Sequence, residues 1–252
     1  MPEGAGVVVV TGGSRGIGAA VARLAGARGY AVAVNYVRDE AAALEVVREI
    51  EGADGRAVAI RGDIAREEET VKLFDDAARA LGPLTALVNN AGVSGRHPGR
   101  LEGLSGDDLS RVLAVNVAGT ILCAREAVRR MSHRRGGPGG VIVNVSSAAA
   151  RLGSPNEWVH YAASKGAVET FTVGLAREVA DEGIRVNAVR PGLIATDIHA
   201  AAGDPDRAAR LAPTVPMKRA GTAEEVAEAV LWLLSPAAAY TTGAILDVTG
   251  GR

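Results

Sequence analysis

Short runs of Val, Ile, Leu and Ala alternate along the chain with longer stretches whose apolar residues recur at helical spacing. Continuous apolar runs of this kind are typical of parallel strands buried on both faces. We expect seven strands, at Val7–Thr11, Ala31–Asn35, Ala57–Arg61, Ala86–Asn89, Val141–Ser146, Arg185–Arg190 and Ala244–Val248. We expect six main helices between them, at Gly16–Arg28, Asp39–Glu51, Glu67–Leu81, Ser105–Arg134, Tyr161–Glu182 and Ala223–Leu234. This alternation predicts right-handed βαβ units, and therefore an α/β fold of the doubly wound Rossmann type, a three-layer sandwich of about seven mostly parallel strands flanked by helices.

Residues that start and stop helices support these boundaries. Thr222 and Glu225 form a capping-box pattern at the start of the last helix, and Ser235-Pro236 follows its end. The glycine-rich stretch 136–140 lies between a helix and a strand, so we interpret it as a loop rather than a linker between domains. We therefore expect residues 1–252 to form a single domain.

Composition and charge narrow the class of protein. Hydrophobic residues make up 48% of the chain but aromatic residues only 3%, so the core must consist largely of aliphatic side chains. With a net charge of −1 and no basic stripe, we expect neither nucleic acid nor a membrane as a partner, and we interpret the basic run from Arg125 to Arg135 as cations near a helix end. The single cysteine, Cys123, lies in an apolar helical stretch, where we expect it to be buried. The lone cysteine and the lack of a secretory or membrane-spanning pattern favour a cytoplasmic protein.

A glycine-rich turn follows the first strand and leads directly into a helix. It reads Thr11-Gly12-Gly13-Ser14-Arg15-Gly16-Ile17-Gly18. Glycines permit a tight turn and let backbone N–H groups approach a pyrophosphate, and the start of the next helix adds partial positive charge. The position of this turn, at the start of a βαβ series, favours a dinucleotide site over a turn without a ligand. The Gly-Lys-Ser/Thr of a P-loop is absent, which argues against a nucleoside triphosphatase.

The end of the second strand bears on which nicotinamide dinucleotide would bind. An acidic residue there would bind the ribose 2′-hydroxyl and repel a 2′-phosphate, but the first acidic residue is Asp39, which we interpret as a helix N-cap. Arg15 and Arg38 can instead both contact a 2′-phosphate through charge-assisted hydrogen bonds, although either one alone would equally well be a solvated surface charge. We therefore prefer NADP(H), with NAD(H) as the alternative.

Tyr161 and Lys165 stand four residues apart at the start of a helical stretch, which places both side chains on one helix face. A phenol has a pKa of about 10, and a neighbouring ammonium favours the phenolate, so such a pair can exchange a proton with a carbonyl or an alcohol. This spacing alone occurs often by chance. Ser146 and Ser147 end the preceding strand, where ligands bind in open α/β sheets, and one of the two hydroxyls can orient a substrate oxygen. Strand alternation alone does not say which one.

The motifs and their order resemble those of the short-chain dehydrogenase/reductases. The resemblance covers nearly the whole chain and rests on Thr11-Gly12-x-x-x-Gly16-x-Gly18, Asn89-Asn90-Ala91-Gly92, Asn116, Ser147, Tyr161-x-x-x-Lys165 and Pro191-Gly192. The chain resembles in particular the 3-oxoacyl-carrier-protein reductases and the glucose 1-dehydrogenase-like members. This implies an NAD(P)-dependent oxidoreductase that acts on CH–OH donors and moves a hydride between NADP(H) and a carbonyl or secondary alcohol. It also implies a homotetramer that packs through the two long helices.

The same resemblance assigns roles to individual residues. It implies Tyr161 as the general acid/base, and Lys165 as the residue that lowers the pKa of Tyr161 and holds the nicotinamide ribose. It implies that Ser147 orients the substrate carbonyl and that Asn116 supports a water-linked proton relay. With the end of the second strand included, the expected cofactor contacts are Gly12, Ser14, Arg15, Gly16, Ile17, Gly18, Asn35, Tyr36, Arg38, Asp63, Ile64, Asn89, Ala91, Gly92, Tyr161, Lys165, Pro191, Gly192, Ile194 and Thr196.

Two segments are candidates for the wall of the substrate pocket, 94–99 and 196–216. The second is long and follows a strand end, which is typical of a mobile lid or a pair of short helices, and we expect a substrate lid around 194–216. Trp158 is equally compatible with the pocket and with the core. For Arg96 and Arg207 we favour solvated surface charges over contacts with an anionic substrate group.

Other functions fit the sequence less well. A serine hydrolase needs a histidine and a strained strand–helix elbow, and none of the four histidines lies in such a context. Their spacing also offers no metal site, so we expect no metal. The alternatives are an NAD-preferring sugar or alcohol dehydrogenase and, less favoured, a non-catalytic nucleotide-sensing regulator, which would have no need of a complete set of catalytic residues. These motifs specify neither the physiological substrate nor the direction of the reaction.

Overall fold

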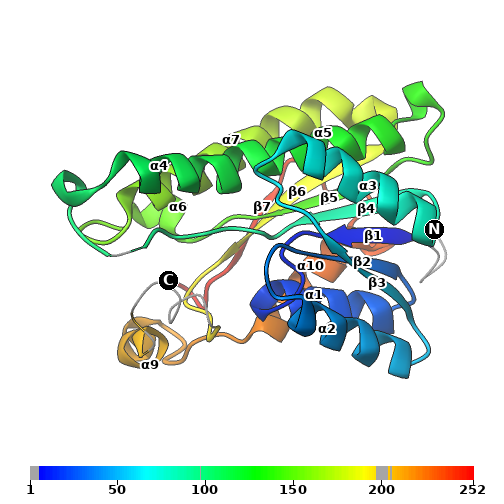
Figure 1. Ribbon diagram of the computed structural model, residues 1–252. Coiled ribbons are helices and arrows are strands. Elements are labelled where there is room, and N and C mark those ends of the chain that lie inside the picture. Colours follow the sequence, from blue (N-terminus) through cyan, green and yellow to red (C-terminus); the bar gives the residue numbers. More distant parts are fainter. Residues whose placement is uncertain (1–5, 97, 197–203, 205) are drawn as a thin grey trace.

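Seven parallel strands form one sheet at the centre of the molecule (Figure 1). The computed structural model describes residues 6–96, 98–196, 204 and 206–252. The strands stand in the order β3-β2-β1-β4-β5-β6-β7. Their bounds are β1 Val7–Val10, β2 Ala31–Tyr36, β3 Arg56–Arg61, β4 Leu84–Asn89, β5 Gly140–Val145, β6 Ile184–Pro191 and β7 Ile245–Val248. The order reverses between β1 and β4, which confirms the predicted doubly wound Rossmann-type fold and opens a crevice at the carboxyl ends of the strands.

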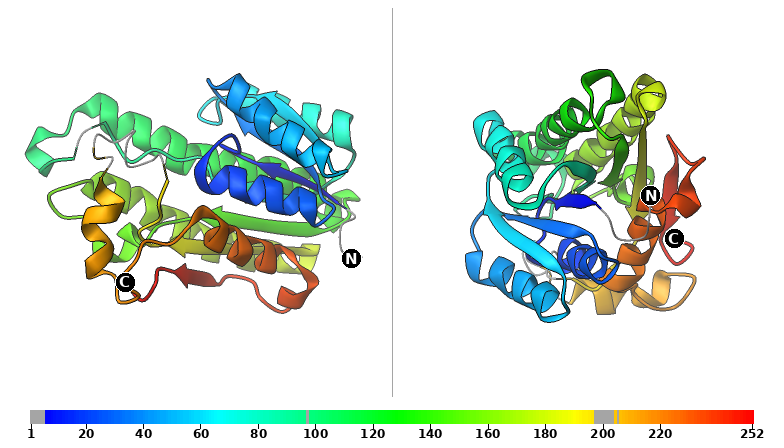
Figure 2. Two further views of the ribbon diagram at one scale, coloured as in Figure 1. Left: turned by 90° about the horizontal axis from the view of Figure 1, so that it is seen from below. Right: turned by 90° about the vertical axis from the view of Figure 1, so that its right-hand side faces the viewer.

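Helices cover both faces of this sheet, as Figures 1 and 2 show. On one face lie α1 (Gly16–Ala27), α2 (Glu40–Gly52) and α10 (Ala223–Leu234). On the other face lie α3 (Glu67–Leu81), α5 (Thr120–Met131) and α7 (Val159–Val179). Each face has its own hydrophobic core, and β1 contributes alternate valines to the two. Because successive strand side chains point to opposite faces, a strand covered on both sides needs an apolar residue at every position.

The expected helix Ser105–Arg134 is not one regular helix. It consists of α4 (Gly106–Leu113), a π-helical segment (Ala114–Gly119) and α5, followed by a short 3-10 turn at His133–Arg135. A π-helical turn keeps the chain helical and only shifts its phase, so the apolar pattern of the sequence did not reveal it. Asn116 lies inside this segment, and π-helical turns are frequent at functional sites.

Among the described residues, two short helices lie outside the six predicted ones; the first was not predicted, and the second lies in the stretch 196–216, where a pair of short helices was one expectation. α6 (Ala149–Leu152) follows β5, and α9 (Arg207–Leu211) precedes a 3-10 turn. Segments of this length are too short to show a helical period in the sequence. Both lie at the end of the molecule that also holds the C-terminus (Figure 1).

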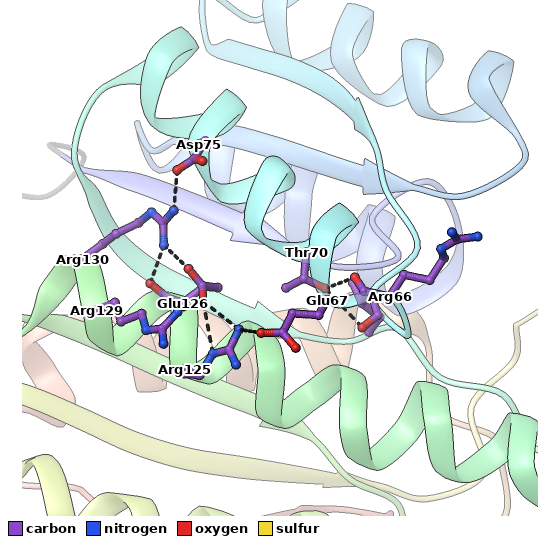
Figure 3. Close-up of polar contacts among 9 residues, drawn as sticks. Arg66, Glu67, Thr70, Asp75, Arg125, Glu126, Arg129 and Arg130 are labelled. Atoms are coloured by element: carbon purple, nitrogen blue, oxygen red, sulfur yellow. Dashed lines mark hydrogen bonds and ion pairs between the residues drawn. The ribbon is translucent and has the colours of Figure 1, made fainter.

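The basic run of α5 gathers around one buried carboxylate (Figure 3). The Glu126 side chain is 3% exposed, and its Oε2 accepts a hydrogen bond from Arg130 at 2.6 Å. Arg130 also bonds Asp75 of α3, and Nη2 of Arg125 lies 2.8 Å from Glu67 Oε1. Burial raises the pKa of Glu126, but the hydrogen bonds from Arg130 and Arg125 outweigh it and hold that pKa below its ordinary value. These arginines therefore join α5 to α3.

Three further observations concern the described part of the chain. Cys123 is fully buried, as the sequence predicted, and burial raises the pKa of its thiol. No described helix is both long and apolar enough to cross a membrane. Within the described residues, no three His, Cys, Asp or Glu side chains are grouped so that they could hold a metal ion.

Candidate active site

A cleft of about 1050 Å³ lies at the carboxyl ends of the strands, and the loops after β1, β2, β3, β4, β5 and β6 form its walls. This volume is at the upper end of the range for small-molecule sites. The predicted residues that line it are Gly12, Ser14, Arg15, Gly16, Ile17, Asn35, Tyr36, Arg38, Asp63, Ile64, Ala91, Gly92, Ser147, Tyr161, Lys165, Pro191, Gly192, Ile194 and Thr196. Three members of the predicted set lie outside its lining, namely Gly18, Asn89 and Asn116.

The turn after β1 presents glycine backbone, without side chains, to the cleft. Gly12 (φ +60°) and Gly16 (φ +52°) adopt left-handed conformations that favour glycine. A Cβ at Gly18 would lie 2.2 Å from the carbonyl oxygen of Gly12, so only glycine permits α1 to pack this closely against the turn. The glycines thus shape the turn in two ways, through backbone conformation and through close packing.

Two amide side chains hold this turn in place. Asn35 Oδ1 accepts a hydrogen bond from the Gly12 N–H at 3.2 Å, and its Nδ2 donates to the Gly62 carbonyl at 2.9 Å. Asn90 Nδ2 donates to the carbonyl oxygens of Thr11 and Gly12, at 3.0 Å each. Asn90 lines the cleft but was not among the predicted site residues, and its only signal in the sequence is its place in the motif after β4.

The first turn of α1 leaves its N–H groups available to an anion. Arg15 is the N-cap of α1, but its side chain makes no capping hydrogen bond and the first turn has no acidic residue. Helix α2, by contrast, is capped as predicted by Asp39, which accepts a hydrogen bond from the Ala42 N–H. Arg15 and Arg38 line the same cleft, and neither is ion-paired with another described residue. Uncapped N–H groups, bare backbone and two unpaired arginines fit the phosphates of a dinucleotide.

Tyr36, Asp63 and Ile64 form the neighbouring wall, at the ends of β2 and β3. Asp63 Oδ1 accepts a hydrogen bond from the Ala65 N–H at 3.0 Å, which fixes the turn after β3. Burial and a hydrogen bond with Glu40 both raise the pKa of the Tyr36 hydroxyl. This wall therefore combines the apolar side chain of Ile64 and the ring of Tyr36 with the carboxylate of Asp63, near the cation of Arg38.

The structure separates the two serines at the end of β5. The side chains of Ser147 and Tyr161 share a hydrogen bond within the cleft. Ser146 instead donates from Oγ to Glu169 Oε1 at 2.7 Å. Burial raises the pKa of Tyr161 above its usual value, and the Ser147 hydrogen bond opposes that rise.

Lys165 lies one helical turn after Tyr161, with Nζ 5.8 Å from the centroid of the Tyr161 ring. Nζ donates to the Val145 carbonyl at 2.7 Å, and burial lowers the pKa of Lys165 to about 8. In this structure the Ser147 hydroxyl is the group that opposes the rise in the pKa of Tyr161, and the effect of the Lys165 ammonium on that pKa stays a prediction.

Two of the predicted residues lie behind the cleft wall. Asn116 is 1% exposed, and it exchanges hydrogen bonds with the N–H and C=O of Val93, at 2.8 and 2.9 Å. It also donates to Ser164 Oγ at 2.9 Å, which joins the π-helical segment to α7. Asn89 donates to Asn144 Oδ1 at 3.0 Å and so ties β4 to β5. Both side chains hold the walls of the cleft in this structure.

Comparison with known proteins decides the family. The chain matches, over residues 12–252, the family model described as Enoyl-(Acyl carrier protein) reductase. The uncharacterized oxidoreductase YgfF of Escherichia coli is 52% identical over 246 residues, which cover 98% of this chain and 99% of that protein. The 3beta-hydroxysteroid dehydrogenase 1 of Eggerthella lenta is 42% identical over 245 residues, which cover 97% and 92% of the two chains. The chain belongs to the short-chain dehydrogenase/reductase family.

A solved structure of the same family gives the same fold. The crystal structure of a short chain dehydrogenase from Burkholderia cenocepacia in complex with NADP has a TM-score of 0.89 at 36% identity, covering 97% of this chain and 96% of the other. As the sequence predicted, this short-chain dehydrogenase/reductase is an NAD(P)-dependent oxidoreductase of the type that acts on CH–OH donors.

Trp158 and Arg207 also line the cleft of this short-chain dehydrogenase/reductase. Trp158 is 5% exposed and lines the cleft, so it serves both the pocket and the core. Arg207 is not the solvated charge that we expected, because its side chain is only 12% exposed. Its guanidinium bonds both carboxylate oxygens of Glu157 and lies 5.2 Å from the centroid of a Trp158 ring. Arg96 is exposed, as predicted.

Only part of the expected lid around 194–216 is described. Residues 197–203 and 205 lie outside the described residues, as does His97 of the other candidate wall. At the near end of this segment Ile194 forms an isolated parallel bridge with Gly221, and at the far end α9 continues into a 3-10 turn at Ala212–Thr214.

Proposed function

We propose that this enzyme transfers a hydride between NADP(H) and a carbonyl or secondary alcohol, with Tyr161 as the general acid/base. The observation that carries the proposal is the hydrogen bond between Ser147 and Tyr161, next to buried Lys165, in the same cleft as the uncapped glycine turn. The nicotinamide ring of the bound cofactor would supply or accept the hydride. The protein's own side chains would supply or remove the proton at the substrate oxygen.

In the proposed mechanism the substrate oxygen lies against the hydroxyls of Tyr161 and Ser147. Ser147 orients this oxygen, and Tyr161 donates a proton to it in reduction or removes one in oxidation. Lys165 would hold the nicotinamide ribose and place a positive charge beside the phenol, which favours the phenolate. Asn116 would support a water-linked proton relay, and its bonds to Val93 and Ser164 keep the neighbouring wall in place.

We propose that NADP(H) is preferred because two cations, Arg15 and Arg38, follow β1 and β2, and the carboxylate after β2, that of Asp39, caps α2. Arg15 and Arg38 line the cleft without ion-pair partners among the described residues, whereas Asp39 is engaged as a helix cap. A 2′-phosphate would pair with these guanidinium groups, and the 2′-hydroxyl of NAD(H) would gain little from them. The other residues proposed to hold the cofactor are the predicted ones that line the cleft, together with Gly18 and Asn89 behind it.

The test measures the binding of NADPH and NADH and the absorbance of reduced nicotinamide with a panel of ketones and aldehydes. We expect Arg15→Ala and Arg38→Ala each to weaken NADPH binding about tenfold, because each removes a hydrogen bond to a charged group, and to leave NADH binding nearly unchanged. Arg48→Ala, at an exposed position on α2, is the matched control. NADPH affinity that survives both changes would favour the NAD-preferring alternative, and tight binding without turnover would favour the non-catalytic regulator.

We further propose a single domain over residues 1–252 with a substrate lid around 194–216, assembled as a homotetramer through the faces of α4–α5 and α7. The exposed apolar side chains Leu109, Leu113 and Ile121 support this choice of face. We propose the cytoplasm as its location, which the free, buried thiol of Cys123 supports.

A further inference from the structure

A buried carboxylate and a buried imidazole lie next to the active site without a part in the proton chemistry. Asp108, in the first turn of α4, is 7% exposed, and His160, directly before Tyr161 in α7, is 9% exposed. His160 Nε2 lies 3.7 Å from Asp108 Oδ2. Helices α4 and α7 lie side by side here (Figure 1). Because carboxylates are seldom buried unless their oxygens have partners, this pair calls for a physical role.

The pair holds the loop that follows β4. Asp108 Oδ2 accepts a hydrogen bond from the Arg96 N–H at 3.1 Å. The preceding residue, Gly95, is buried and has a φ of +119°, a conformation that L side chains rarely adopt. A Cβ at Gly95 would lie 2.9 Å from His160 Nε2, 3.0 Å from Asp108 Oδ2 and 2.9 Å from Trp158 Cδ1. The backbone of the loop therefore fits between these side chains only because it carries no side chain of its own.

The other end of this loop is fixed by Asn116, which bonds both the N–H and the C=O of Val93. Val93 and Ser94 line the cleft, whereas Asp108 and His160 do not. The stretch 93–96 is thus held at two points. One point is held by Asn116, a proposed catalytic residue, and the other by the Asp108–His160 pair.

We propose that Asp108 and His160 are positioning residues, which hold Val93–Arg96 as a fixed wall of the substrate pocket beside Tyr161 and so determine how tightly substrate binds. The inference rests on the proposed function, because it concerns the substrate of that reaction. Neither side chain touches the proton path of Tyr161 and Ser147. Loss of the pair should therefore weaken ground-state and transition-state binding together, which raises KM and leaves kcat nearly unchanged.

Asp108→Ala removes the acceptor for the Arg96 N–H and the neighbour of His160. We expect KM for the carbonyl substrate to rise about tenfold, with kcat changed less than about twofold and the Kd of NADPH unchanged. Asp108→Asn retains an oxygen acceptor and should recover most of the affinity. Asp107→Ala removes an exposed carboxylate from the same helical turn and should leave KM as it is.

Gly95→Ala tests the same wall from the side of the loop. The added Cβ cannot fit between the pair, so KM should rise here as well, and combining it with Asp108→Ala should raise KM by less than the product of the two single effects. Fully multiplicative effects would show that the loop and the pair act independently, and would overturn the proposal. So would a folded Asp108→Ala enzyme with unchanged KM, or one that loses kcat alone.

Hydrogen exchange gives a readout that does not depend on turnover. In the NADPH complex, the amides of residues 93–96 should exchange faster in Asp108→Ala than in the wild type or in Asp107→Ala. Unchanged exchange would refute the positioning role even in a fully active enzyme. A wild-type protein that turns over no carbonyl compound would refute the proposed function instead, while accelerated exchange in Asp108→Ala would still support the hold on the loop.

Discussion

Lys165 is buried and Tyr161 is half-buried in the cleft, and the loss of hydration disfavours the charged form of each side chain. It raises the pKa of Tyr161 and lowers that of Lys165 to about 8. The proposed acid/base chemistry needs the opposite for Tyr161, a phenolate that forms readily. Opposite charges placed side by side favour each other, so the protonation of Tyr161 and that of Lys165 should depend on each other when the site is in use.

Tyr161→Phe removes the proton donor and keeps the ring. We expect turnover to fall by about 10²–10⁴-fold, the usual contribution of a general acid/base, while the Kd of NADPH stays nearly constant. The measurement is the loss of reduced-nicotinamide absorbance with the best ketone or aldehyde. Tyr240→Phe, at a fully exposed tyrosine, should be inert. Near-normal turnover of Tyr161→Phe would remove this residue from the mechanism.

Lys165→Met should stabilise the protein at neutral pH. The folded-state pKa is lowered from 10.5 to about 8, so the unfolded chain binds more protons between these values and the wild type gains stability as the pH rises through that window. The shift corresponds to about 3 kcal/mol of cost for the buried cation at pH 7. In thermal unfolding, the Tm of the variant should be higher than that of the wild type at pH 7, and this difference should shrink from about pH 8 upward. Lys72→Met, at an exposed lysine, should show no such trend. A difference that stays constant with pH would contradict the burial argument.

At the scale of elements, α9 is attached to the cleft wall by one side chain. Arg207 joins it to Glu157 and Trp158, which directly precede α7. A partly buried, bidentate ion pair that stacks on an aromatic ring stabilises a short helix more than the helix propensity of its residues does.

Arg207→Ala should release α9 from this wall. We expect KM for substrate to rise about five- to twentyfold with NADPH binding unchanged, since removing one partner leaves the Glu157 carboxylate half-buried and unpaired. Arg210→Ala, on the same helix with a side chain 57% exposed and paired only with Asp204 among the described residues, is the matched control. Equal kinetics of the two variants would show that α9 does not form part of the substrate pocket.

At the scale of the whole molecule, α4 and α5 expose three large apolar side chains. Leu109, Leu113 and Ile121 are 37%, 41% and 40% exposed. In light scattering we expect a mass four times that of the 25.7 kDa chain. Ile121→Glu should reduce that mass because it places a charge in the proposed interface, and Leu44→Glu, on α2 at similar exposure, should not. A wild-type monomer would refute the proposed tetramer.

The sequence by itself determined the layers of the fold and most of the cleft. Strands buried on both faces must be apolar at nearly every position, so the strand predicted at Val7–Thr11 corresponds to β1, Val7–Val10, without any contact information. The capping box of Thr222 and Glu225 and the N-cap at Asp39 are also local, because each bond joins residues within one turn. The glycine turn is local for the same reason, and the cleft follows because parallel strands bring their carboxyl ends to one edge.

Only the tertiary structure decided what depends on residues far apart in the chain. It directed Ser147 to Tyr161 and Ser146 to Glu169, a choice that strand alternation left open. It showed that the site of Asn116 is a π-helical segment, because that phase shift changes no apolar pattern. It buried Arg207 against residues 157–158, 50 positions earlier. Such contacts depend on how whole elements pack in space, and neither composition nor residue spacing specifies that packing.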